Sequence, residues 1–211
     1  MIQREIWRLV ERDLLSHPSG EALFNPYLSN HAEADKLDGH LIRQANLRAY
    51  FRSLGALPPV LIVGEASGPW GCRFSGVPFT SERQLCSGLL PFRGRQSSQN
   101  VEPYHERTAG IFWDVLAPYY PRCFIWNAVP LHTHLPGEPF SLRRPMLSEV
   151  RQFQDLLADI TAAVSPAKII AVGRIAQRAV RNIGMTPCCV RHPSHGGMRE
   201  FRAGIEAALT N

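Results

Sequence analysis

Four short apolar runs, each bounded by proline, glycine or polar residues, constrain the fold of this chain most strongly. They read PPVLIVGE (58–65), RCFIWNAV (122–129), AKIIAVG (167–173) and, with a weaker pattern, TPCCVRH (186–192). Runs of this length that are apolar throughout are typical of strands buried on both faces of a sheet. Apolar residues at helical spacing follow or precede them, at 108–118, 146–164 and 173–183. The alternation predicts an α/β fold, a three-layer α/β/α sandwich around a central, mostly parallel four-stranded sheet.

The N-terminal part of the chain, about residues 1–56, has a helical pattern. Apolar residues recur at helical spacing in 2–17, where Ile6, Val10 and Leu14 share one face, and again in 39–55. The second pattern ends on Gly55, a residue type that commonly follows the last turn of a helix. A chain of 211 residues can bury one sizeable core, so we expect a single domain over 1–211.

The basic residues are dominated by arginine. Lys36 and Lys168 are the only lysines among 23 basic residues, and the net charge is +5. The guanidinium group forms bidentate contacts with phosphate, so this composition favours nucleic acid or another polyanion as the partner. GC-rich codon usage also raises the arginine content, and the composition alone does not separate the two explanations.

The cysteine pattern and the apolar content exclude several other classes. The five cysteines include no C-x-x-C pair, which argues against a disulfide framework, a zinc site and an iron–sulfur cluster. No apolar run approaches the roughly 18 residues of a membrane span, and the charged N-terminus is unlike a signal peptide. We therefore expect a cytoplasmic protein with reduced thiols, no cofactor and no membrane association.

Ligands of open α/β sheets bind at the carboxyl ends of the strands. This rule selects four loops, which cover 64–79, 127–139, 173–176 and 191–199. The long stretch 66–106, rich in proline and glycine, overlaps the first of them, and we interpret it as a lid or groove wall.

Residue types suited to binding a flat polar ring stand in these loops. Glu65 follows the first strand, where a carboxylate can position or activate a water molecule, and Gly64 lets a ligand approach the backbone. Phe79 offers a ring for stacking. Asn127 stands where the second strand ends, and its amide carries a donor and an acceptor that match N3–H and O4 of uracil.

Each of these residues also has a structural interpretation. A carboxylate after a strand can cap a turn, a phenylalanine can pack in the core, and a buried amide can bond to the backbone. The histidines His132, His134, His192 and His195 are potential metal ligands. No carboxylate stands beside them at metal-binding spacing, so we expect no metal site.

Taken together, the motifs resemble those of one enzyme family. G-E-x-x-G (64–68), G-x-P-F (76–79), Asn127 and H-P-S (192–194) occur in the order found in the uracil-DNA glycosylase superfamily, over the chain from about residue 58 to its end. The resemblance implies a monofunctional glycosylase of base excision repair, which flips uracil out of DNA and hydrolyses its N-glycosidic bond with water as the nucleophile. We expect a monomer whose partner is DNA containing uracil or another damaged base.

The resemblance also implies roles for individual residues. Glu65 matches the position that handles water, and His192 matches the histidine that hydrogen-bonds O2 of the departing base. Gly64, Ala66, Phe79 and Asn127 match the pocket that holds the base. The remaining matches form the loop that enters the DNA minor groove: Ser194, His195, Gly196, Gly197, Met198 and Arg199.

The chain departs from the family pattern inside the first motif. Ser67 replaces the usual proline, and Ala66 stands where the best-known branch has an aspartate. Gly68 matches a tyrosine that blocks the methyl group of thymine, so thymine exclusion must come from elsewhere, with Trp70 and Cys72 as the candidates. A glycosylase for hypoxanthine, xanthine or a 5-substituted uracil, and a DNA-binding relative without catalysis, are the alternatives.

Overall fold

The computed structural model describes residues 2–54 and 59–210. Its centre is a parallel sheet with strand order β3-β2-β5-β6. These strands are β2 (Val60–Ala66), β3 (Cys123–Val129), β5 (Lys168–Val172) and β6 (Cys188–Val190). In the register of the two longest strands, Gly64 of β2 pairs with Asn127 of β3. The sheet confirms the four strands expected from the apolar runs, and it is parallel throughout.

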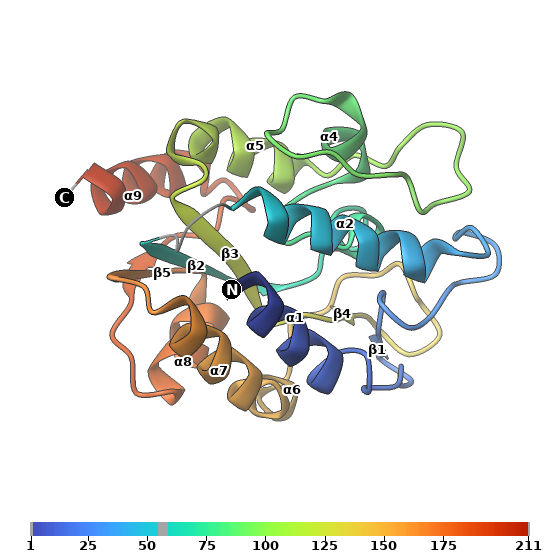
Figure 1. The fold of residues 1–211 in the computed structure, drawn as a ribbon, viewed down its shortest axis with the longest axis horizontal. Coiled ribbons are helices and arrows are strands. Elements are labelled where there is room, and N and C mark those ends of the chain that lie inside the picture. Colours follow the sequence, from blue (N-terminus) through green and yellow to red (C-terminus); the bar gives the residue numbers. More distant parts are fainter. Residues whose placement is uncertain (1, 55–58, 211) are drawn as a thin grey trace.

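Helices cover both faces of the sheet, which gives the predicted three layers (Figure 1). One layer contains α1 (Ile2–Asp13), α6 (Leu147–Gln152), α7 (Gln154–Val164) and α8 (Arg174–Asn182). The other contains α2 (Gly39–Ser53), α5 (Arg107–Leu116) and α9 (Met198–Thr210). β2 and β3 are buried almost along their whole length because helices pack against both sides, and this explains their continuous apolar sequences.

Smaller elements complete the fold. β1 (Leu23–Phe24) and β4 (His132–Thr133) form a separate antiparallel pair, and a 3-10 turn, η1 (Ala117–Tyr119), extends α5. The stretch 66–106 contains two short helices, α3 (Cys72–Ser75) and α4 (Glu82–Ser87). None of the helices in the described residues is long and apolar enough to cross a membrane.

Several predicted helix ends are wrong. The pattern at 146–164 forms two helices, because the backbone bends at Phe153, whose buried ring packs against His17 at a centroid distance of 5.2 Å. The first helix ends at Asp13 rather than at 17. The side-chain amide of Asn25 donates to the carbonyl oxygens of Leu14 and His17, both at 2.7 Å, and thereby holds a turn at this point.

Other boundaries differ less. The fourth strand is limited to Cys188–Val190, since Pro187 before it has no N–H group for the ladder. Gly184 has a left-handed backbone with φ of 78° just after α8, as expected for a residue that ends a helix. The helix that was expected to end at Gly55 ends at Ser53, and Gly55 itself lies outside the described residues.

Buried ion pairs fix the path of the stretch 66–106. The Asp35 carboxylate accepts hydrogen bonds from Arg43 at 3.0 Å and from Arg73 of α3 at 2.6 Å, and all three side chains are buried. The Glu82 carboxylate of α4 accepts the backbone N–H groups of Ser97 and Ser98. The stretch is thus attached to the N-terminal helical part, and this attachment sets where its last residues lie.

Candidate active site

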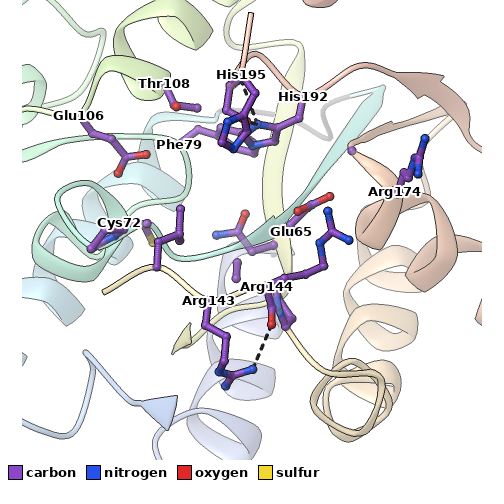
Figure 2. A pocket seen from close by; sticks show the side chains of 18 of the residues that line it. Glu65, Cys72, Phe79, Glu106, Thr108, Arg143, Arg144, Arg174, His192 and His195 are labelled. Atoms are coloured by element: carbon purple, nitrogen blue, oxygen red, sulfur yellow. Dashed lines mark hydrogen bonds between the residues drawn. The ribbon is translucent and has the colours of Figure 1, made fainter. Parts of the chain in front are cut away.

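A pocket of about 850 Å³ opens at the carboxyl ends of the strands (Figure 2). Each of the four loops selected from the sequence contributes to its lining. The predicted site residues that line it are Glu65, Ala66, Phe79, Asn127, His192, Ser194 and His195. The other lining residues are Gly68, Pro69, Cys72, Glu106, Thr108, Leu142, Arg143, Arg144, Pro145, Gly173, Arg174, Gln177, Val190 and Arg191.

The floor of the pocket is built around Gly64. A Cβ atom at this position would lie 2.5 Å from Oδ1 of Asn127 and would collide with the ring of Phe79. Only a residue without a side chain therefore allows the amide of β3 and the ring of Phe79 to lie against β2. Asn127 is 2% exposed and lines the pocket, and none of the described residues forms a side-chain hydrogen bond with its amide.

Phe79 has a left-handed backbone with φ of 52°, which is uncommon for a residue with a side chain. Its ring stacks on Phe112 of α5, with centroids 4.1 Å apart and planes inclined by 11°. The ring therefore packs against the core, which was the alternative to a stacking role, and it also lines the pocket. A left-handed backbone held by packing is a feature that concentrates at ligand sites.

Glu65, near the end of β2, faces the N-terminus of α8. Its Oε1 accepts the backbone N–H of Ile175 at 3.2 Å. This hydrogen bond orients the carboxylate, and no other hydrogen bond to it comes from the described residues. Figure 2 shows the guanidinium of Arg144 extending toward the Glu65 carboxylate.

His192 lines the pocket near Phe79, and the centroids of the two rings are 6.2 Å apart. Nδ1 lies 2.7 Å from the Ser194 hydroxyl and accepts the Ser194 backbone N–H at 3.2 Å. Burial, the charge of Arg191 and the neighbouring His195 lower the pKa of His192 to about 4. The ring is therefore neutral at pH 7.

The predicted DNA loop lies at the rim. His195 has a left-handed backbone with φ of 51° and is exposed, as is Gly196. Gly197 is buried against the carbonyl of His192. Met198 and Arg199 are exposed residues of the first turn of α9 and do not line the pocket, so the glycine pair ends where this helix begins.

The family model for the uracil DNA glycosylase superfamily matches residues 52–205. This range covers most of the chain and includes every predicted site residue. The chain belongs to this superfamily. The fold is also similar to the crystal structure of SMUG2 from Pedobacter heparinus, with a TM-score of 0.64, 11% sequence identity, and coverage of 98% of this chain and 99% of that chain. No curated protein matches the sequence.

Sequence reasoning missed several polar residues of this superfamily member's pocket. Exposed guanidinium groups of Arg144, Arg174 and Arg191 line it. Arg174 lies directly after Gly173 in the selected loop 173–176, so its position at the end of a strand could have indicated that it lines the pocket. Arg144 is beyond the selected range 127–139. The carboxyl of Glu106 enters the pocket from the end of the stretch 66–106, and no local sequence pattern indicates it.

His132, another of the potential metal ligands, has structural partners. His132 is fully buried, and its Nδ1 lies 2.9 Å from the carbonyl oxygen of Ser67. Burial lowers the pKa of His132 to about 4. Within residues 2–54 and 59–210, no group of three or more histidine, cysteine or acidic side chains is arranged to hold a metal ion.

Proposed function

We propose that this superfamily member is a monofunctional DNA glycosylase that hydrolyses the N-glycosidic bond of uracil in DNA. The observation that carries the proposal is the arrangement of Phe79 and Asn127, which both lie against Gly64. It presents an aromatic ring and an amide without a side-chain partner to the same pocket. A uracil ring stacked on Phe79 would offer O4 to the amide NH2 and N3–H to the amide oxygen. Burial makes this recognition selective, since a mismatched donor or acceptor would remain unpaired.

His192 supplies the stabilisation that the departing base needs. When the bond between C1′ and N1 breaks, its electron pair remains on uracil, and negative charge develops on O2. A neutral histidine with its proton on Nε2 donates a hydrogen bond to that oxygen. The pKa of about 4 supports this role, because the ring is then neutral at pH 7 before the reaction begins.

Glu65 assists at the sugar. Positive charge develops on the sugar as the base leaves, and a carboxylate stabilises it. Water then adds to C1′ and transfers a proton to the carboxylate, while the uracil anion is protonated on release. The hydrogen bond from Ile175 to Oε1 leaves Oε2 as the oxygen for this water.

The rim of the pocket is assigned to DNA. A base within a duplex must leave the stack before it can enter the pocket. The segment 194–199 would enter the minor groove, with Met198 and Arg199 filling the space that the base vacates. Alanine at both positions is expected to reduce uracil excision more opposite adenine than opposite guanine, because a mispaired base costs less to unstack.

The proposal is tested with labelled oligonucleotides that carry uracil, hypoxanthine or xanthine, each as single strand and duplex. They are incubated with the protein and then treated with alkali, which cleaves the chain at abasic sites. We expect the strand to break at uracil only after alkali treatment, because a monofunctional glycosylase removes the base and leaves the strand intact. Preferential cleavage at hypoxanthine or xanthine would show that this base, and not uracil, is the substrate. Absence of cleavage at all three bases would refute a glycosylase of this class.

A further inference from the structure

The Glu106 side chain closes one end of the pocket. It precedes α5 and lies over the backbone of Gly68 and Gly71. A Cβ atom at position 68 would lie 2.7 Å from Oε1 of Glu106, and one at position 71 would collide with its carboxyl group. In Figure 2, Glu106 and Cys72 lie on one side of the pocket, and Glu65, Arg144 and Arg174 lie on the other. The carboxyl thus occupies the space that a side chain at position 68 would fill.

This half-buried carboxyl differs from the fully buried carboxyls of Asp35 and Glu82. Asp35 accepts hydrogen bonds from two arginines, and Glu82 accepts them from backbone N–H groups and a serine hydroxyl. No donor among residues 2–54 and 59–210 is bonded to the carboxyl of Glu106. Burial raises the pKa of Glu106 to about 7. The absence of side chains at Gly68 and Gly71 leaves room for this carboxyl at the pocket wall, where it is free to contact a ligand.

We propose that Glu106 is a specificity-determining residue, whose carboxyl forms the pocket wall against the C5 edge of the flipped pyrimidine and thereby excludes thymine. This inference rests on the proposed function. O2, N3 and O4 of uracil are used by His192 and Asn127, so the C5–C6 edge is the one that remains. A methyl group on C5 would press against the carboxyl and cover it without offering a hydrogen bond, which is unfavourable for a polar group.

Trp70 and Cys72, the two candidates for thymine exclusion from the sequence, are less well placed for it than Glu106. The ring of Trp70 stacks on Phe140 with centroids 5.6 Å apart, and Trp70 does not line the pocket. Cys72 does line the pocket, but its thiol is held by the Ser67 hydroxyl at 3.1 Å. Glu106 therefore has the better position, since the three described atoms nearest to a Cβ built on Gly68 all belong to its carboxyl group.

The experiment compares single-turnover excision of uracil and thymine, each opposite guanine, by the wild type, Glu106→Ala, Glu106→Gln and Glu102→Ala. Glu102 is an exposed acid of the same segment and serves as the control. We expect Glu106→Ala to raise the thymine-to-uracil rate ratio by about 10- to 100-fold, the range for one methyl group in a pocket. Glu106→Gln has nearly the same volume and should retain the exclusion, and Glu102→Ala should match the wild type.

A binding measurement separates this inference from the proposed function. Duplexes containing the uncleavable 2′-fluoroarabino analogues of deoxyuridine and thymidine are titrated with each variant that retains the wild-type melting temperature. If Glu106→Ala does not fold, Glu106→Ser replaces it. An unchanged thymine-to-uracil ratio in the alanine or serine variant, in rate or in affinity, overturns the role of Glu106. Absence of uracil excision by the wild type refutes the proposed function instead, and the affinity ratio then still decides the role of Glu106.

Discussion

The backbone N–H of Ser194 donates to Nδ1 of His192 at 3.2 Å. A ring nitrogen that carries a hydrogen cannot accept a hydrogen bond, so Nδ1 is unprotonated and the neutral ring carries its proton on Nε2, an assignment made from this hydrogen bond. The Ser194 hydroxyl lies beside the same nitrogen, at 2.7 Å. The H-P-S motif is thus a local device that sets the tautomer of its own histidine. The resulting Nε2–H donor is the form that stabilises a developing anion.

The first prediction concerns the protonation of His192. Because its pKa is lowered to about 4, the ring should stay neutral as the pH falls from 8 to about 5 and gain its proton only around pH 4. NMR of ring-labelled histidine measures this directly, and the spectrum of His192→Gln identifies the resonance. We expect the Nε2–H tautomer at pH 7. A midpoint near 6.5 or a proton on Nδ1 would contradict the assignment.

Removal of the His192 ring should affect the chemical step. His192→Ala is expected to lower the single-turnover rate by about 10²–10³-fold, the usual loss for one donor to a developing oxyanion. Binding of uncleaved DNA should change little, since the hydrogen bond strengthens only as the bond breaks. His195→Ala, in the same loop but exposed, is the matched control. Equal losses for both variants would show that the loop, and not the His192 ring, is responsible.

A methyl group at position 64 should disrupt the pocket floor. In Gly64→Ala the new Cβ would collide with the Phe79 ring and lie 2.5 Å from Oδ1 of Asn127. We expect a loss of about 1–3 kcal/mol in the free energy of unfolding from overpacking. Misplacement of the ring and the amide should lower uracil excision by about 10²-fold. Gly20→Ala, where nothing lies within 4 Å of the new Cβ, should leave stability and activity near wild type.

Asn127→Asp tests the reading of the base edge. The substitution keeps the shape of the side chain but replaces the NH2 donor by an oxygen that repels O4 of uracil. The rate of uracil excision should fall by about 10- to 100-fold or more, the equivalent of leaving a buried group unpaired. Asn100→Asp, at an exposed position, controls for the added charge. Wild-type excision by a folded Asn127→Asp protein would remove Asn127 from the site.

Arginines at the pocket rim should contribute to DNA affinity through phosphate. We expect Arg174→Ala to weaken binding of undamaged and uracil-containing duplex alike, and to reduce the slope of log K against log salt by about 1. Arg8, exposed on α1 and not part of the pocket, gives the control substitution Arg8→Ala. The measurement is a salt titration of binding. An unchanged slope in Arg174→Ala would exclude a phosphate contact by this residue.

The four apolar runs were sufficient to predict the central sheet and to place its strands, although not their exact ends. The buried positions of β2 and β3 are apolar except for Asn127 in β3, so the composition within one short window was sufficient. Glu65 and Asn127 follow from these strands, because the carboxyl ends of neighbouring parallel strands lie at one edge. Helix ends were less predictable. Asn25 holds the turn after α1 from 11 positions beyond Leu14, and Phe153, which divides α6 from α7, packs against His17, which lies far from it in the chain.

Which polar groups complete the pocket depends on how distant parts of the chain pack together. Glu106 and Gly68 are 38 positions apart, and nothing in either neighbourhood indicates that they meet. Their contact depends on the path of the stretch 66–106, which the buried pairs of Asp35 with Arg43 and Arg73 hold in place. Local patterns record the burial of a strand or helix, since burial acts on each residue separately. Contacts between side chains of different loops depend on the packing of the whole molecule, and no window of sequence contains that information.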